Sequence, residues 1–220
     1  YSTPLNFHLT EDLLSYLKCQ NMFCVGHDRE FRPIIYMYPL RVKEADLDRF
    51  GASSRFYSSV LQKYWLKKYH VENWNIILDL ENAGITNFPL KAMKSMTEVS
   101  SLAFCGRLNK MLILNPSFFF FGLWKLIKVF LHADTLAKII FVKKSKHEEI
   151  FKYFDKEQII QKYGGTLKPP SAPFPIFLGP EIKEEQPTPN TKKHEHGMET
   201  RSMTFSVKSL SSMIEVLQIP

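Results

Sequence analysis

One carboxylate stands where an open α/β sheet often carries catalytic groups. Asp79 lies near the end of the apolar run 74–80, and catalytic side chains often follow such strands. A carboxylate there also caps the next turn, and we favour that structural role. The chain contains no Gly-rich phosphate loop followed by Lys-Ser/Thr, no GxGxxG and no GxSxG. We therefore predict that the protein is not an enzyme; the alternative, an α/β hydrolase, lacks a nucleophile that we can nominate.

The candidate metal ligands are few and poorly spaced. Four residues separate Cys19 from Cys24, and no second ligand pair accompanies them. The segment His194-Glu195-His196 lacks the second histidine of an HExxH motif and lies in a charged, proline-rich stretch. We therefore predict no metal site and no cofactor.

The composition is that of a globular chain with a large apolar content. Of 220 residues, 45% are hydrophobic and 23% are charged, which excludes a disordered or collagen-like polymer. Three Cys are too few for a disulfide scaffold, and their odd number suits a reducing compartment. Residues 1–24 lack the basic start and apolar core of a signal peptide. We therefore expect a cytoplasmic protein.

The net charge of +7 favours an acidic partner, either an anionic lipid surface or a nucleic acid. The basic residues are dispersed, for example at Arg55, Lys63 and 143–146, and no nucleic-acid-binding motif accompanies them. Attraction to a membrane explains the same charge with one assumption fewer. We therefore predict no nucleic-acid partner.

The elements that must position these side chains alternate along the chain. Short apolar runs alternate with amphipathic segments, which is typical of strands joined through helices. The predicted strands are 32–40, 74–80, 110–115 and 138–142. The predicted helices are 10–24, a long helix that includes Ser53 to Trp65, 89–105, 118–131, 147–154 and 156–162. This order predicts an α/β fold with a mostly parallel sheet that helices cover.

Residues 111–131 are apolar enough to raise the question of a membrane span. Asn115, Pro116, Lys125 and Lys128 interrupt them. Each charge near the centre of a bilayer costs about 2.5–3.5 kcal/mol on insertion scales. We therefore expect a strand, a turn and a very apolar helix here.

The predicted organisation is one domain with a helical segment before it and a tail after it. Residues 1–25 form the N-terminal helical segment, and 26–168 form the folded domain. Residues 169–202 are rich in Pro and charge, which predicts a flexible linker. Residues 203–220 are expected to form a short strand and an amphipathic helix, and docking of this end onto the domain is left open.

Four stretches, taken in order, resemble the signatures of a known family. They are GHDREFRPIIYMYPL from Gly26, IILDLENAG from Ile76, the run from Gly106 to Ile139, and Tyr163-Gly164-Gly165. Over about 26–165 the chain resembles the CRAL-TRIO family, the lipid-binding domains of the retinaldehyde- and tocopherol-binding proteins and of the yeast phosphatidylinositol-transfer protein. The resemblance implies an α/β sheet whose floor and covering helices enclose an apolar cavity for a single lipid.

The resemblance also implies that 118–131 is a mobile gate over this cavity. Its aromatic side chains would cover the cavity when closed and enter a membrane when open, and Lys125 and Lys128 would meet anionic head groups at about 1 kcal/mol each. The residues alone leave another interpretation open, a plain core with a solvated lysine face. The candidate cavity and gate residues are Tyr36, Tyr57, Phe118, Phe119, Phe120, Phe121, Trp124, Ile127, Phe130 and Leu131.

A lipid head-group site is implied at Lys138, Thr135 and Arg107. In phosphatidylinositol-binding members, the Glu of a Pro-Glu-Arg triplet pairs with the Lys of a Thr-x-x-Lys motif. The Pro and Glu positions are Cys105 and Gly106 here. Loss of the carboxylate weakens the assignment to phosphatidylinositol without abolishing it, because Lys138 can still meet a phosphate as a point charge.

Three further departures from the family pattern bear on the ligand. The Ser/Thr pair that helps some members bind phosphatidylcholine falls near Trp74 and Ile76, so we expect that mode to be lost. Phe31 replaces the Gly of the family's Gly-Arg-Pro turn. The small helical subdomain that usually precedes the domain has no counterpart here beyond the helix 10–24, so it is either absent or trimmed.

The resulting prediction is non-enzymatic binding and transfer of a single lipid between membranes through a gated hydrophobic cavity. The expected ligand is a phosphoinositide or other glycerophospholipid, and other hydrophobic small molecules stay open. The expected protein is cytoplasmic and attaches transiently to an anionic membrane surface. The alternative is a ligand-free module of the same fold that binds or regulates a protein partner.

Overall fold

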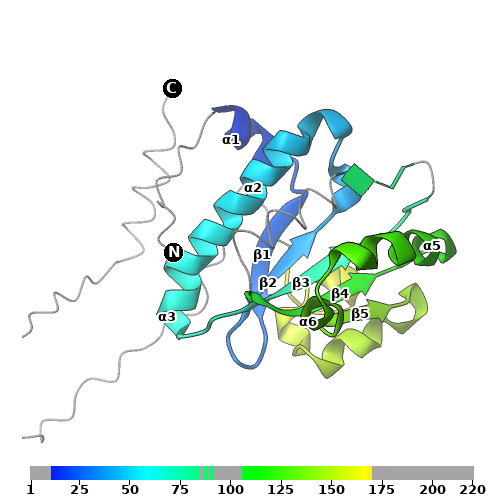
Figure 1. Cartoon of the computed structure of the whole chain (residues 1–220). Helices are drawn as coiled ribbons and strands as arrows, with labels where there is room; N and C mark the ends of the chain where they lie inside the picture. The colour runs from blue at the N-terminus through cyan, green and yellow to red at the C-terminus, as the bar shows by residue number, and fades with distance from the viewer. Residues whose placement is uncertain (1–10, 85–86, 89, 92–105, 170–220) are drawn as a thin grey trace, which may run out of the picture. The chain divides into compact units, whose positions relative to one another are not determined.

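The computed structural model describes residues 11–84, 87–88, 90–91 and 106–169, all within the compact unit 1–180. They form a five-stranded sheet in the order β1-β2-β3-β4-β5 (Figure 1). The strands are β1 (Met22–His27), β2 (Pro33–Met37), β3 (Trp74–Asp79), β4 (Leu108–Leu114) and β5 (Ile139–Val142). β1 pairs antiparallel with β2, and the other neighbouring pairs are parallel. The predicted α/β fold with a mostly parallel sheet is therefore confirmed.

The first strand occupies residues that the sequence assigned to a helix. Helix α1 covers only Glu11–Leu17, and Gln20 then adopts a left-handed backbone with φ of 48°. β1 begins at Met22 and pairs with β2, for example Phe23 with Tyr36. The prediction of a single helix over 10–24 is therefore wrong, because the partner that stabilises β1 lies further along the chain.

A β-bulge between Cys24 and His27 lets β1 lie close to the segment that packs beneath it. Gly26, in the bulge, has a φ of 75°, and a Cβ there would lie 2.1 Å from the backbone oxygen of Gln158. Only glycine fits both the conformation and the approach.

The two faces of the sheet carry separate cores, because side chains alternate along each strand. On β3, for example, Leu78 belongs to the first core and Ile77 to the second. The first core includes residues of α1, α2 (Leu47–Val60) and α5 (Phe118–Ile127). On the opposite face (Figure 1), the second core includes residues of the 3₁₀ helices η5 (Lys144–Lys152) and η7 (Gln161–Tyr163), with η6 (Lys156–Gln158) between them. The helix predicted at 147–154 is thus observed as the 3₁₀ helix η5, whereas the single helix predicted at 156–162 is wrong: η6 and η7 are short 3₁₀ turns separated by the extended residues Ile159 and Ile160.

The long helix between β2 and β3 begins earlier than the residues on which it was predicted. It starts at Leu47, continues from α2 into a π-helical stretch (η3, Leu61–Leu66) and ends with α3 (Lys67–Tyr69). Trp65, in the π-helical stretch, is buried and donates its indole N–H to the carbonyl of Phe31 at 2.7 Å. This bond ties the helix to the loop between β1 and β2.

The connection from β4 to β5 crosses the first face of the sheet. Ser117 accepts a hydrogen bond from the N–H of Phe120 at 3.3 Å and so caps α5. A 3₁₀ turn (η4, Lys128–Phe130) and α6 (Ala133–Leu136) then lead into β5. The helix predicted over 118–131 is thus observed as α5 and η4.

The remaining predicted elements lie outside the described residues, except that residues 90 and 91 of the predicted helix 89–105 are helical. The linker 169–202, apart from residue 169, and the elements predicted in 203–220 are among those outside. Within the described part of the chain, no helix is long and apolar enough to cross a membrane.

Candidate functional site

Helix α5 packs one aromatic side against the sheet. Phe120 is only 2% exposed, and its ring lies 6.0 Å from that of Phe141 on β5. Trp124, one turn later, meets the ring of Phe141 edge-on at 5.2 Å. Ile127, another turn on, also belongs to the first core. The spacing of three to four residues therefore gives α5 a buried stripe.

The other side of α5 leaves large rings in water. Phe118 is 88% exposed, Phe119 is 54% exposed and Phe121 is also exposed. We call these three residues the exposed ring cluster. Lys125 and Lys128, towards the C-terminal end of the helix, are exposed as well. The rings of Phe118 and Phe119 lie 6.2 Å apart, and the ring of Phe121 also contacts Phe141 at 5.6 Å. Single exposed apolar side chains are common, whereas larger exposed apolar patches are typical of interaction sites.

The other predicted cavity residues do not all lie on this face. Tyr57 is buried in the first core, and Leu131 packs against that core. Nothing is described for the side chain of Phe130. Tyr36 belongs to the second core, where its ring lies 6.1 Å from that of Tyr163. The sheet therefore separates Tyr36 from the predicted residues that belong to or pack against the first core: Tyr57, Phe120, Trp124, Ile127 and Leu131.

The predicted head-group residues meet at the amino ends of the parallel strands. Lys138, just before β5, donates from Nζ to the carbonyl of Leu108 at 2.7 Å. Arg107, just before β4, donates from its guanidinium to the carbonyl of Glu72 at 3.0 Å. Thr135 lies in α6 and accepts the backbone N–H of Lys138 at 3.1 Å. The structure thus brings the three positions to one edge of the sheet.

With respect to the described residues, these two cations keep unused hydrogen-bonding capacity. Lysine has three N–H donors and arginine five, and the structure gives one side-chain hydrogen bond to each of Lys138 and Arg107. Among the described residues, no carboxylate pairs with either. Gly106, at the position of the family's Glu, has open space around it. An anion bound at either cation would therefore not have to displace a carboxylate of the described residues.

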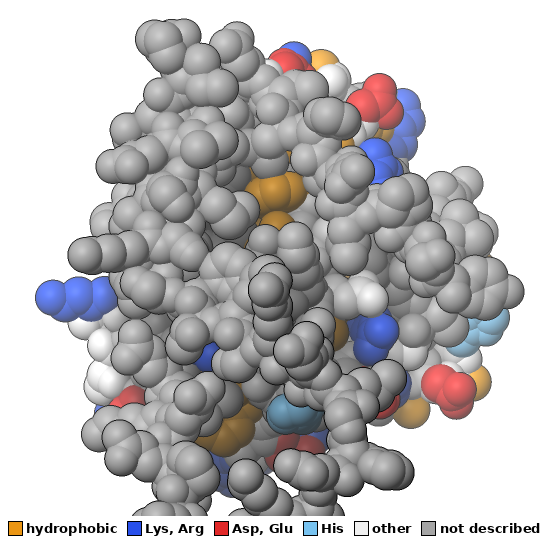
Figure 2. Space-filling view, turned by 90° about the vertical axis from the view of Figure 1, so that its left-hand side faces the viewer, with side chains coloured by type: hydrophobic (Ala, Val, Ile, Leu, Met, Phe, Trp, Pro, Cys, Tyr) orange, Lys and Arg blue, Asp and Glu red, His pale blue; other side chains and the backbone are white. Residues whose placement is uncertain are grey.

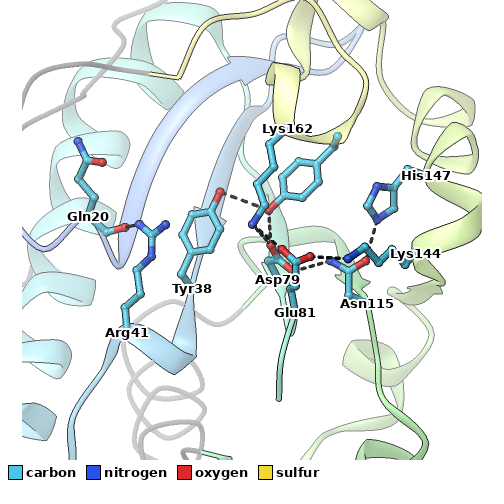
Figure 3. A network of polar contacts seen from close by, with 10 residues as sticks. Gln20, Tyr38, Arg41, Asp79, Glu81, Asn115, Lys144, His147 and Lys162 are labelled. Carbon is cyan, nitrogen blue, oxygen red and sulfur yellow. Dashed lines mark hydrogen bonds and ion pairs between the residues drawn. The ribbon is translucent and has the colours of Figure 1, made fainter. Parts of the chain in front are cut away.

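The opposite edge of the sheet carries a buried polar cluster around Asp79 (Figure 3). Asp79 is 3% exposed, and its oxygens receive hydrogen bonds from the Tyr163 hydroxyl at 2.7 Å, the Asn115 amide at 2.7 Å and the backbone N–H of Glu81 at 2.9 Å. The ammonium of Lys162 completes the set. The predicted capping role of Asp79 is confirmed by the bond from Glu81.

A second ring of contacts surrounds this cluster. Glu81 pairs with Lys144 at 2.8 Å and with Lys162 at 3.3 Å. His147 lies with Nε2 at 2.8 Å from the side-chain oxygen of Asn115 (Figure 3). Apart from Asp79, these residues were not predicted as a cluster, although Asn115 and Tyr163 belong to motifs on which the family resemblance rests.

The protonation states of the cluster suit a structural role. Burial raises the pKa of Asp79, but the hydrogen bonds from Lys162 and Tyr163 outweigh it and hold the pKa below its usual value. Burial, with Tyr38 and Asp79 nearby, raises the pKa of the Tyr163 hydroxyl. Asp79 is therefore an ionised acceptor with four donors, and it is not poised as a base for a substrate.

The described residues hold no group of three or more His, Cys, Asp or Glu side chains that could bind a metal ion. Cys19 is exposed and Cys24 is buried, and burial raises the pKa of the Cys24 thiol. The segment His194-Glu195-His196 lies outside the described residues.

Comparisons with known proteins identify the family of the chain. A model of the CRAL/TRIO domain family matches residues 17–165, more than half of the chain. The chain is similar to a CRAL-TRIO domain-containing protein of Saccharomyces cerevisiae, with 29% identity over 127 residues, 51% of this chain and 41% of the relative. It is also similar to the phosphatidylinositol/phosphatidylcholine transfer protein SFH12 of Arabidopsis thaliana, with 28% identity over 102 residues, 45% of this chain and 19% of the relative. The chain thus spans less than half the length of either relative.

The fold has a counterpart among solved structures. The crystal structure of Sfh5 matches with a TM-score of 0.55 and 11% sequence identity, over 74% of this chain and 64% of that chain. At this identity the likeness concerns the fold alone. Together with the family match, it leads to the conclusion that the chain belongs to the CRAL-TRIO domain family.

Proposed function

We propose that this protein binds a single lipid and transfers it between membranes without catalysing a reaction, and that α5 is the gate of the binding cavity. The observation that carries the proposal is the division of α5 into two aromatic sides. Phe120 packs on the sheet, whereas Phe118 and Phe119 are exposed to water. Membership of a family with relatives named as phosphatidylinositol/phosphatidylcholine transfer proteins supports lipid binding at the level of the family.

The exposed ring cluster would be stabilised by an apolar surrounding that covers it. Aromatic rings are favourable at a membrane interface, and a helix with rings on both sides can exchange one apolar surrounding for another. In the closed state of α5, its buried side would cover a lipid tail. In the open state of α5, the exposed ring cluster would enter the membrane interface, and Lys125 and Lys128 would lie beside anionic head groups.

The proposed cavity lies on the first face of the sheet, between α5 and the residues of the first core. Its proposed lining includes Tyr57, Trp124, Ile127 and Leu131, all of which belong to that core or pack against it. Tyr36 is left out, since it lies on the other face.

The proposed head-group contact is a phosphate at Lys138 and Arg107. Both side chains keep donors free and have no carboxylate partner among the described residues, so an anionic head group would add charge-assisted hydrogen bonds. A phosphoinositide or another glycerophospholipid meets this requirement.

We also propose a cytoplasmic location with transient attachment to an anionic membrane. On the face seen in Figure 2, the described Lys and Arg side chains (blue) are interspersed with Asp and Glu (red). No nucleic-acid-binding motif accompanies the basic residues of the sequence, and an anionic membrane accounts for the same net charge.

A second candidate function, a ligand-free module that binds or regulates a protein, has its own supporting observation. Lys138 and Arg107 already hold backbone carbonyls at the edge of the sheet, which is a structural role without any lipid. An exposed ring cluster also suits a protein partner.

Transfer of labelled phosphatidylinositol between vesicles tests the choice between lipid transfer and a ligand-free module that binds a protein. The variant Phe118→Ser/Phe119→Ser removes the two most exposed rings and leaves the buried side intact. We expect transfer to fall at least about tenfold with little change in stability, since surface substitutions usually alter it by about 0.5 kcal/mol or less.

The matched control is Phe31→Gly, which removes an exposed ring away from α5 at a position whose φ of 60° suits glycine. Its transfer should stay at the wild-type rate. If wild-type protein transfers nothing but captures a protein through the same two rings, the second candidate function replaces the first.

A further inference from the structure

The two outer strands of the sheet differ in how far they are covered. β1, at one end of the strand order, is buried over residues 22–26, and His27 donates its backbone N–H to the side chain of Gln158 at 3.2 Å. β5, at the other end (Figure 1), is only partly buried over residues 139–141. A strand at the edge of a sheet presents unpaired backbone groups to which another chain can bind. Of the two outer strands, β5 is therefore the more accessible one.

The hydrogen bonds to β4 show which backbone groups of β5 point outward. Met111 donates its N–H to the carbonyl of Lys138 at 2.9 Å. In a parallel ladder, alternate residues of a strand bond to the same neighbour, so Ile140 also faces β4. The N–H and C=O groups of Ile139 and Phe141 therefore point away from β4, and no described residue bonds to them. Two donors and two acceptors thus line the edge.

The side chains of β5 are apolar on both faces of the sheet. Ile139 and Phe141 pack against the first core, and Ile140 packs against the second. The ring of Phe121, which belongs to the exposed ring cluster, lies 5.6 Å from that of Phe141. Because successive side chains of an added strand alternate between the two faces, those on the first face would cover Phe121 and Phe141. The edge therefore offers apolar contacts as well as hydrogen bonds.

Lysines flank this strand. Lys138 immediately precedes β5 and Lys143 immediately follows it, and no carboxylate of the described residues pairs with either. Lys125, on the helix that packs against β5, is exposed as well. The nearest exposed carboxylates in the sequence, Asp134 and Glu148, belong to α6 and η5. The charges immediately beside the strand are therefore positive.

We propose that β5 accepts an acidic, extended segment of a partner protein as an additional strand of the sheet. In this mode of recognition, main-chain hydrogen bonds supply the affinity and alternate side chains supply the specificity. A second copy of this chain is a poorer occupant, because it would bring the same lysines to the edge, and like charges across paired strands are destabilising. An acidic segment instead meets complementary charge at both ends of β5. The inference goes beyond the proposed function and does not depend on it, since the edge needs no lipid.

Nuclear magnetic resonance of the isotope-labelled full chain, without lipid, tests the proposal. The probe is the peptide acetyl-Glu-Val-Thr-Val-Thr-Glu-amide, which combines a strand-forming centre with acidic ends. We expect it to bind with a dissociation constant at or below about 1 mM. The amide signals of Ile139 and Phe141 should shift more than those of Ile140 and Val142, because only the outward-facing N–H groups acquire a new partner.

Two further peptides separate strand pairing from charge. Methylation of every central backbone nitrogen removes the donors of the peptide and keeps its charges, so the affinity should fall at least about tenfold. Replacement of both Glu by Lys keeps the donors and reverses the charges. This lysine-flanked peptide should bind the wild type at least about threefold more weakly than the acidic peptide does.

The variant Lys143→Glu tests the same complementarity from the side of the protein. The Lys143 side chain is exposed, so the substitution should leave the fold intact. The variant should bind the acidic peptide at least about threefold more weakly than the wild type, and the lysine-flanked peptide more tightly. The control is Lys18→Glu, which changes the net charge equally at an exposed position between α1 and β1, at the opposite end of the strand order. It should bind both peptides like the wild type.

Binding that is independent of the backbone or of the local charge would overturn the proposal. A wild type that does not bind the acidic peptide at β5, or that binds the methylated peptide equally well, contradicts the addition of a strand. An equal loss of affinity in Lys143→Glu and Lys18→Glu contradicts it too, because the peptide would then respond to net charge alone. Without peptide, protection of the Ile139 and Phe141 amides that rises with protein concentration would identify a second copy as the occupant, and would likewise overturn the proposal.

Discussion

The two ends of the parallel strands differ in how their charges are compensated. At the carboxyl ends, Asp79 is buried and its oxygens accept bonds from four partners, including Lys162 and Tyr163. At the amino ends, Lys138 and Arg107 each hold a backbone carbonyl, and no carboxylate among the described residues pairs with them. A saturated cluster gains nothing from a ligand, whereas cations with spare donors gain from an anion. We therefore assign a structural role to the cluster at the carboxyl ends of the strands, and we propose that the cations at the amino ends bind a ligand.

The carboxyl end should dominate stability. Asp79→Asn removes the charge that Lys162 and Tyr163 share in a buried site, and we expect a loss of about 3–4 kcal/mol in the free energy of unfolding. This loss is in the lower part of the usual range, since Lys162 is 41% exposed. Urea denaturation measures the loss. The control Asp155→Asn breaks an exposed pair with Arg29 and should cost about 1 kcal/mol or less; equal losses would contradict the assignment.

Two glycines differ in the space that surrounds them and should respond differently to alanine. A Cβ at Gly165 would lie 1.8 Å from the backbone oxygen of Ile159, so Gly165→Ala forces the backbone apart. We expect a loss of about 2–3 kcal/mol. Gly106, at the amino end, has a φ of 77°, and a Cβ there would have no neighbour within 4 Å, so Gly106→Ala should cost only about 1 kcal/mol for the conformation. Thermal or urea unfolding measures both losses, and a larger loss at Gly106 would contradict the account of the space around the two glycines.

The amino end should dominate binding. Lys138→Met keeps the apolar stem and removes the ammonium, so the apparent affinity for phosphatidylinositol-containing vesicles should fall about tenfold, the equivalent of about 1.4 kcal/mol. Unfolding should change by less than about 1 kcal/mol, because the bond to the Leu108 carbonyl is partly exposed.

The control for that experiment is Lys144→Met, which removes an ammonium paired with Glu81 at the carboxyl end. It should leave the affinity for vesicles unchanged. An equal loss for both variants would mean that the lysines act through net charge and not through a site.

The smallest expected difference between the two ends is in how the free energy of unfolding depends on acid pH. Hydrogen bonds from Lys144 and Lys162 hold the pKa of Glu81 below its usual value, and the pKa of Asp79 is also lowered. The stability they contribute is complete above their usual values of about 4 and is lost as pH falls through the lower folded values. The free energy of unfolding, measured from about pH 5 to about pH 2, should therefore fall less steeply for Asp79→Asn than for the wild type. Lys138→Met should keep the wild-type slope.

The sequence predicts the inner strands well because their signal is local. Apolar runs bounded by turns located β2 to β5 to within a few residues. β1 was missed since its short run follows a helical pattern, and only pairing with β2 decides between the two. The start of α2 at Leu47 was missed for a similar reason: the apolar periodicity is clear only from Ser53 onward.

The candidate site could be predicted only in part. The Thr135-x-x-Lys138 motif correctly predicts the entry to β5, but nothing in the sequence says that Lys138 would hold the carbonyl of Leu108. The side chains that surround Asp79 come from positions as distant as Lys162, and pairing across such separations depends on the fold. Tyr36 was grouped with α5 because an aromatic in a strand gives no sign of which face it occupies.

Native mass spectrometry of the purified chain, after incubation with mixed phospholipid vesicles and removal of those vesicles, tests the central claim most directly. We expect one lipid molecule per folded chain, with phosphate-bearing lipids retained preferentially and less retention in Lys138→Met. A folded wild-type chain that carries no lipid from vesicles of any composition would contradict the account.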